Sequence, residues 1–368
     1  MELIKRFSKK PAYVLSEKDL RWNKFIDEIC VKELHELNDI QTNHAHTRIG
    51  SHGFVFTKRE VSMNNKVISS NDRLMLSRKS LEGLSIGDCF GETFFGEPED
   101  VAKKISNRQI KPAPWHFTDD TIMSICIYKT LEKFGHIRQY ELSKLFGLNY
   151  LKDCRRGYGG TAHSILQALG RGDDWRKISS EVFDGMGSMG NGAAMRAAPI
   201  GAYFFDDVDE TVRQARFSAE ITHFNEEGIA GAIAVALAAA LAVNYKNGAY
   251  TRTGNDFILD VAKKVPESNT KYKIEAGQRV EKSSSIEFAV SALGNGLSVM
   301  AQDTVPIAIW CVSHFLDNDE EALWKAVSAL GDRDTICAIV GGIVVLNSDN
   351  YPSEWKLAAE NPFESQFI

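Results

Sequence analysis

The sequence predicts an all-α domain that follows an N-terminal extension of different character. Three observations indicate this fold class. From Leu84 onward nearly every segment has apolar residues at helical spacing, few segments alternate as strands do, and glycine-rich loops separate the helical segments. A length of 368 residues suits one large helical domain with an added segment, or two or three smaller domains.

The extension is expected over residues 1–78 and the helical domain over residues 79–368. A capping-box-like start leads into an amphipathic helix predicted over about residues 17–40, whose apolar positions include Trp22 and Phe25. The polar stretch after this helix has no helical period. It is either a short hairpin or a mobile segment.

Eight segments of the domain have the apolar spacing of helices. Their expected bounds are 121–134, 161–169, 210–222, 226–243, 286–299, 303–316, 319–330 and 335–346. The alanine-rich run 229–243 is the most apolar stretch, but it is too short to span a bilayer, so we expect a buried core helix and no membrane association.

The composition is that of an ordinary soluble globular protein, with 43% hydrophobic and 25% charged residues. A net charge of −6 argues against a nucleic-acid partner. The six cysteines lack the paired short spacing of zinc or redox sites, and the N-terminus lacks the apolar core of a signal peptide. We therefore expect reduced thiols and a cytoplasmic protein.

Two predicted helix starts each present one threonine and two aspartates. The first has Thr118, Asp119 and Asp120, and the second has Asp332, Asp334 and Thr335. If the two starts face each other, four carboxylates share a small volume and need cations to stay ionised. Oxygen donors of this kind suit Mg²⁺, with Mn²⁺ close behind. On spacing alone, two unrelated capped helices explain the pattern equally well.

Several motifs follow one another through the domain. They are IGDCFGE at 86–92, FTDDTIM at 117–123, GYGGT at 157–161, GSMGNGAAMRAAPIG at 187–201, THFNEEGIAGA at 222–232, DTVPIAIW at 303–310 and GDRDTICAIVGG at 331–342. In this order they resemble the ADP-ribosylglycohydrolase family, which includes the dinitrogenase reductase-activating glycohydrolase. The resemblance covers about residues 79–368.

The resemblance implies a compact all-α domain with two Mg²⁺ ions between the aspartate clusters. The implied metal ligands are Thr118, Asp119, Asp120, Asp332, Asp334 and Thr335. The implied activity is hydrolysis of the N-glycosidic bond that joins ADP-ribose to a protein side chain, with arginine as the expected side chain. Asp119, Asp120 and Asp334 are then also catalytic residues.

The chain departs from the family pattern at the position expected to supply the general acid. Many relatives have a glutamate at the position of Phe95. Glu92 lies one helical turn earlier and could replace it as the fourth predicted catalytic residue. An ordinary surface glutamate is the alternative.

The glycine-rich loop at 187–194 is predicted to cradle a phosphate, because glycines let backbone N–H groups approach an anion. The predicted substrate-binding residues are Gly159, Ser188, Gly190, Asn191, Gly192 and His223. His223 could contact the pyrophosphate or the adenosine, or be a structural histidine. Arg333 could pair with a phosphate or point to solvent.

Two hypotheses of function remain open, and both can hold. The first is a hydrolase that reverses the action of an ADP-ribosyltransferase. The second is an immunity protein of a toxin–antitoxin pair, which inserts its N-terminal extension into the active site of a cognate ADP-ribosyltransferase toxin. An extension that packs on the catalytic domain or mediates dimerisation is the structural alternative.

Overall fold

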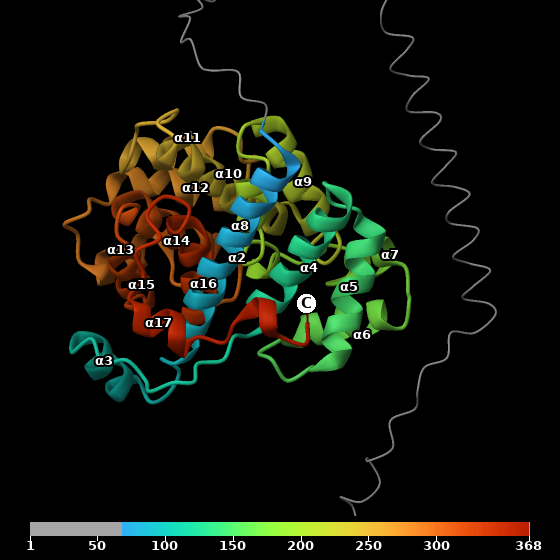
Figure 1. Cartoon of the computed structure of the whole chain (residues 1–368), viewed down its shortest axis with the longest axis horizontal. Helices are drawn as coiled ribbons and strands as arrows, with labels where there is room; N and C mark the ends of the chain where they lie inside the picture. Colours follow the sequence, from blue (N-terminus) through green and yellow to red (C-terminus); the bar gives the residue numbers. More distant parts are fainter. Residues whose placement is uncertain (1–67, 368) are drawn as a thin grey trace, which may run out of the picture. The chain divides into compact units, whose positions relative to one another are not determined.

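The regular structure is helical throughout residues 68–367, the part of the chain that the computed structural model describes (Figure 1). The α-helices are α2 (Ser70–Glu92), α3 (Pro98–Ser106), α4 (Asp119–Phe134), α5 (Gln139–Lys152), α6 (Gly160–Gly170), α7 (Trp175–Glu181), α8 (Ala198–Tyr203), α9 (Val208–Glu220), α10 (Glu226–Lys246), α11 (Asn255–Ala262), α12 (Asn269–Ala276), α13 (Ile286–Leu293), α14 (Ala301–Phe315), α15 (Asp319–Val327), α16 (Arg333–Val344) and α17 (Ser353–Ala358). Short 3₁₀ helices are η1 (Asn191–Ala193), η2 (Gly277–Arg279) and η3 (Pro362–Glu364).

No strand occurs within these residues, where β-pairing is limited to two isolated bridges. The predicted all-α fold class is therefore confirmed. The eight predicted helices correspond to α4, α6, α9, α10 and α13 to α16. The largest difference is at α13, which ends at Leu293 and not at 299, because Gly294 takes a φ of 95° and its N–H closes the last turn onto Val290.

The described helices belong to a compact unit that spans Lys66–Ile368. The predicted boundary between residues 78 and 79 lies inside α2, which starts after a capping box in which Ser69 and Asp72 bond reciprocally. The helix predicted over residues 17–40 and the possible hairpin lie outside the described residues.

Helices α2 and α16 make close contact; they lie side by side in Figure 1. Along α2, a Cβ atom at Gly83, Gly87 or Gly91 would overlap the backbone of α16. Glycine at every fourth position thus lets the two backbones touch. The C-terminal end of α2 consequently lies against the N-terminal end of α16, where Asp334 is located.

The alanine-rich run forms the central part of α10. By length and mean hydropathy (1.9) this helix could cross a membrane, but 83% of its apolar window is buried by the surrounding helices. Helices α8, α9 and α14 pack against it. The run is therefore a core helix of this domain, as the sequence predicts.

Candidate active site

The first acidic helix start, at α4, is held by a carboxylate from another helix. Asp88, buried in α2, accepts hydrogen bonds from the N–H and hydroxyl of Thr118 (both 2.9 Å) and from the N–H and hydroxyl of Thr121 (3.1 and 2.6 Å). Thr118 makes no side-chain cap of its own. Because Asp88 satisfies these donors, Asp119 and Asp120 are not required as caps. The capping alternative is wrong for this helix start.

The second acidic helix start, at α16, is linked to the glycine-rich loop. Asp332 Oδ2 accepts a hydrogen bond of 2.5 Å from the Asn191 amide, which also lies 3.0 Å from the Thr304 hydroxyl. Asp332 makes no capping bond either. The buried oxygens Asp334 Oδ1 and Asp120 Oδ1 have no hydrogen-bond partner within the described part of the chain. Such oxygens are costly to bury unless a cation compensates them.

The carboxyl groups of the two starts disfavour one another's ionisation. Burial and the charge of Asp334 raise the pKa of Asp88 to about 7 and that of Asp332 to about 8. Burial is also the largest cause for Asp119 and Asp120, whose pKa values rise well above the usual range. A divalent cation would reverse this preference, because it stabilises the ionised form of every carboxyl group around it.

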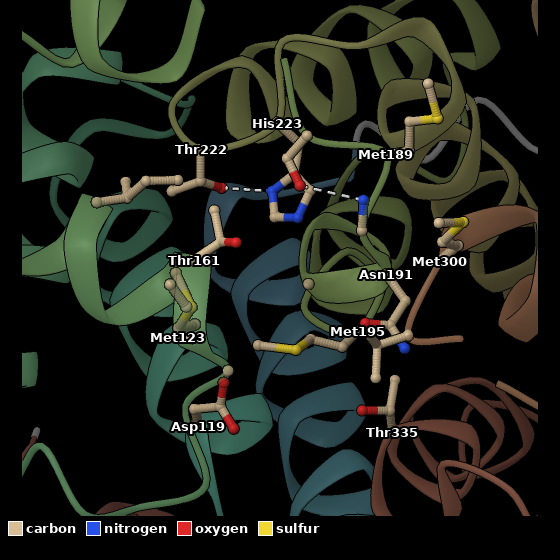
Figure 2. Close-up of a pocket in the computed structure, with 18 of the residues that line it drawn as sticks. Asp119, Met123, Thr161, Met189, Asn191, Met195, Thr222, His223, Met300 and Thr335 are labelled. Atoms are coloured by element: carbon tan, nitrogen blue, oxygen red, sulfur yellow. Dashed lines mark hydrogen bonds between the residues drawn. The ribbon is translucent and has the colours of Figure 1, made fainter. Parts of the chain in front are cut away.

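A cavity of about 490 Å³ is bordered by both acidic starts and by the glycine-rich loop. The predicted site residues that line it are Asp119, Gly159, Ser188, Gly190, Asn191, Gly192, His223, Asp332, Asp334 and Thr335. Figure 2 shows Asp119 and Thr335 at one end of this cavity and His223 at the other. The structure therefore brings residues of both acidic helix starts together with all six predicted substrate-binding residues. The first start contributes Asp119, and the second contributes Asp332, Asp334 and Thr335.

Three predicted residues do not line the cavity. Thr118 and Asp120 lie on the same turn as Asp119, behind the cavity wall, with the Thr118 hydroxyl 3.0 Å from Asp120 Oδ2. Glu92 is the last residue of α2 and is largely exposed. Even so, burial of part of its side chain and the charge of Asp334 raise its pKa to about 6. In this arrangement, Glu92 therefore does not directly contact a ligand in the cavity.

The glycine-rich loop is held by close contacts with residues 299–301 on one side and with His223 on the other. It is bridged to the segment before α14 by hydrogen bonds from Asn191 N–H to Val299 O (3.0 Å) and from Ala301 N–H to Met189 O (2.9 Å). A Cβ atom at Gly190 would lie 3.0 Å from His223 Nε2. Glycine at this position leaves room for the imidazole and for an anion near the backbone.

Arg333 does not simply point to solvent, because its side chain is partly buried, and its pairing with a phosphate stays a prediction. Its guanidinium carbon lies 5.1 Å from the centre of the Phe95 ring, which is 47% exposed. A cation over an aromatic face is a stabilising pair. Phe95 therefore offers a surface that holds Arg333 beside the acidic start of α16.

Sequence reasoning missed several residues that shape the cavity. Asp88 lies in a quoted motif, yet its role depends on a contact between two helices. Arg196 and Thr222 also line the cavity, and neither was selected. Apolar side chains complete the wall, and they include Met123, Met186, Met195, Met300 and Phe183. Methionine and aromatic side chains of this kind accommodate a flat apolar group such as a nucleobase.

The donor set fits hard divalent cations in its chemistry. It offers carboxylate and hydroxyl oxygens, and two of the carboxylate oxygens are buried without hydrogen-bond partners among the described residues. In residues 68–367, however, no three Asp, Glu, His or Cys side chains are already gathered as a cation site. Cation binding would therefore require the carboxylates to turn toward a common centre.

Comparison with known proteins gives the same family as the ordered motifs. The family model described as ADP-ribosylglycohydrolase matches residues 69–358. The chain is 28% identical to human ADP-ribosylhydrolase ARH3, with 79% of this chain and 91% of that protein covered. It is 22% identical to the ADP-ribosylarginine hydrolase Tri1 of Serratia proteamaculans, with 78% and 76% covered.

A solved structure described as an ADP-ribosylglycohydrolase-related protein complex has the same fold. The TM-score is 0.56 at 20% sequence identity, over 80% of this chain and 95% of that one. Family model, relatives and fold agree with one another and with a cavity that joins two acidic helix starts to a glycine-rich loop. The chain belongs to the ADP-ribosylglycohydrolase family and is an ADP-ribosylhydrolase.

Proposed function

We propose that this chain is a Mg²⁺-dependent hydrolase that releases ADP-ribose from modified arginine side chains of proteins. The observation that carries the proposal is the shared cavity, which has carboxylates of two helix starts at one end and His223 at the other, with the glycine-rich loop reaching the acidic start of α16 through Asn191. The relative named ADP-ribosylarginine hydrolase supports the choice of arginine.

The two helix starts would hold two Mg²⁺ ions, which Mn²⁺ could replace. The proposed ligands are Thr118, Asp119, Asp120, Asp332, Asp334 and Thr335. When bound, such ions activate a water molecule and offset charge around the reacting sugar. The unpartnered oxygens of Asp120 and Asp334 support this assignment, because they are available donors in a buried place.

The glycine-rich loop would bind the diphosphate of ADP-ribose. The Ser188 hydroxyl accepts a hydrogen bond from Gly190 N–H (3.1 Å), so its own proton is free to be donated to a ligand. The amide of Asn191 is already engaged with Asp332 and Thr304. We therefore assign Asn191 to holding the loop against the acidic start of α16, and Gly159, Gly190 and Gly192 to close backbone approach.

The proton for the departing guanidine nitrogen is assigned to Glu92. A pKa of about 6 leaves a usable fraction protonated near neutral pH. Because Glu92 does not line the cavity, the proton would reach the leaving group through a water molecule. The oxocarbenium-like sugar that forms as the N-glycosidic bond breaks would be stabilised by the surrounding carboxylates.

The direct test uses peptides that carry ADP-ribose on arginine, serine or cysteine, each incubated with the full chain in Mg²⁺ and in chelator. Released ADP-ribose is measured by chromatography. We expect release from the arginine-linked peptide in Mg²⁺ only. Release from serine alone would overturn the arginine assignment, and no release from any linkage would overturn the proposed function.

The toxin-immunity role rests on the N-terminal extension, whose residues 1–67 lie outside the described structure. We propose that the extension binds a cognate ADP-ribosyltransferase in the cytoplasm while the domain removes ADP-ribose from its targets. The five cysteines within the described residues are all free thiols, which suits a reducing compartment. Binding of the full chain and of a chain lacking residues 1–67 to such a transferase tests this role.

A further inference from the structure

Arg196 is a fully buried cation that has no carboxylate partner within residues 68–367. Its side chain is 0% exposed, and the guanidinium lies 4.7 Å from the centre of the Phe146 ring. Its Nη atoms donate to Gly192 O (2.5 Å), Ser218 O (3.0 Å) and Thr222 Oγ1 (2.8 Å). An unpaired buried charge is costly, so a benefit elsewhere must offset it.

The Thr222 hydroxyl connects this charge to His223. Oγ1 lies 2.7 Å from His223 Nδ1, and a dashed line in Figure 2 marks this contact. A guanidinium can only donate, so Oγ1 accepts from Arg196 and keeps one proton to donate. In the described part of the chain, His223 Nδ1 is the acceptor within reach of that proton.

The reverse arrangement leaves a buried proton unpaired. If Nδ1 carried the proton, the hydroxyl would accept from both neighbours and its own proton would have no acceptor among residues 68–367, at a threonine that is 4% exposed. Such an unsatisfied donor is costly to bury. The positive charge of Arg196 further polarises the hydroxyl and makes it a better donor.

We infer that Arg196 and Thr222 are positioning residues that hold His223 as its Nε2–H tautomer, with this N–H directed into the cavity beside the glycine-rich loop. Nε2 has no hydrogen-bond partner in the described structure and faces Gly190 and Gly192, whose missing Cβ atoms leave the space open. The ring is neutral, because burial, and then the charge of Arg196, lower the pKa of His223 to about 3.

The consequence for recognition is that His223 offers a neutral donor and requires an acceptor atom on the ligand. This step rests on the proposed function, under which the acceptor is an oxygen of ADP-ribose. A neutral imidazole with a fixed proton discriminates between an acceptor and a donor at this place in the cavity, whereas an imidazole free to exchange tautomers does not.

The tautomer is measured on the full chain by ¹⁵N NMR of selectively labelled histidine at neutral pH, with the His223 signals assigned from a His223→Gln variant. We expect a proton on Nε2 and none on Nδ1 in the unaltered protein. Thr222→Val should produce a mixture of tautomers, and Thr222→Ser should restore the single one. Thr211→Val is the matched control, because it removes a buried hydroxyl that donates to Phe204 O (2.9 Å), away from the cavity.

Isothermal titration with ADP-ribose gives the functional readout. If the two tautomers become about equally populated in Thr222→Val, binding should weaken about twofold, because only the competent fraction binds, while Thr222→Ser and Thr211→Val should bind as the unaltered chain does. A proton on Nδ1, an imidazolium at neutral pH, or an unchanged tautomer in Thr222→Val would each overturn the inference. If the unaltered chain does not bind ADP-ribose, the proposed function fails and the NMR result alone decides the tautomer.

Arg196 is tested separately through Arg196→Met. A folded variant with mixed tautomers supports its role, and a folded variant that keeps the single tautomer overturns it. Circular dichroism reports whether the variant folds, and where it does not, Thr222→Val decides whether the hydroxyl sets the tautomer.

Discussion

The acidic helix starts predict an unusual dependence of stability on pH in the cation-free protein. Asp332 has an ordinary pKa of 3.8, which burial and Asp334 raise to about 8 in the folded chain. The folded state therefore binds a proton that the unfolded chain has already lost. The resulting stability is fully present below about pH 4 and is lost as the pH rises toward about 8.

The magnitude follows from the raised pKa. Each pH unit within this window changes the free energy of unfolding by about 1.4 kcal/mol per group, so going from about pH 5 to about pH 7 costs roughly 3 kcal/mol through Asp332 alone. For a domain of this size, that loss lowers the melting temperature by roughly 5–10 °C. Asp88, whose pKa rises to about 7, adds to the slope.

The assay is thermal unfolding in chelator at several pH values, for the unaltered chain and for Asp332→Asn. The variant should have a shallower slope and a higher melting temperature near neutral pH, because it carries no charge at this position. Asp209→Asn is the control, since the Asp209 side chain is 86% exposed. Saturating Mg²⁺ should remove most of the slope. A melting temperature that is flat or rises from about pH 5 to 7 in chelator, or an equal slope in Asp332→Asn, would refute the reasoning.

Four further predictions follow from the structure. Asp119→Ala should lower turnover at least about 100-fold while the protein stays folded in chelator, as kinetics and melting would report. In saturating Mg²⁺, kcat should fall as the pH rises through the pKa of Glu92, which burial keeps above its usual value, because Glu92 loses its proton, and Glu92→Gln should lack this decline. Gly87→Ala should lose roughly 2–3 kcal/mol of stability by forcing α2 away from α16, whereas Gly277→Ala, with no atom nearer than 3.6 Å to the new Cβ, should not. Deleting residues 1–67 should leave hydrolysis of a small ADP-ribosylated substrate intact, since every predicted site residue lies after residue 67; lost catalysis or unfolding would reject the partner-arm hypothesis.

Eight helices were predicted from their apolar period, whereas others, among them α2, α3 and α5, were not. The buried positions of α2 include the small or polar residues Ser77, Ser80, Gly83, Ser85 and Gly87 beside the large apolar Leu81, Leu84 and Phe90. Hydrophobic spacing indicates only part of such a face, because the contact at its glycines depends on close approach of the α16 backbone. The domain was consequently expected to start at residue 79, inside this helix.

The candidate site was predictable where its functional residues are neighbours in the sequence. The two aspartate clusters and the glycine-rich loop are local motifs, so their residues could be named. The support given by Asp88 and Arg196 could not, since each acts through contacts with distant segments. Arginine is also rarely buried without a carboxylate, which makes Arg196 an improbable choice from sequence alone.

The most direct measurement of the central claim is a crystal structure of the chain with Mn²⁺ and ADP-ribose, in which anomalous scattering locates the cations. We predict anomalous peaks between Asp119 and Asp334, with the ADP-ribose diphosphate against the loop at 187–194. Cations bound elsewhere, or ADP-ribose bound outside this cavity, would contradict the account.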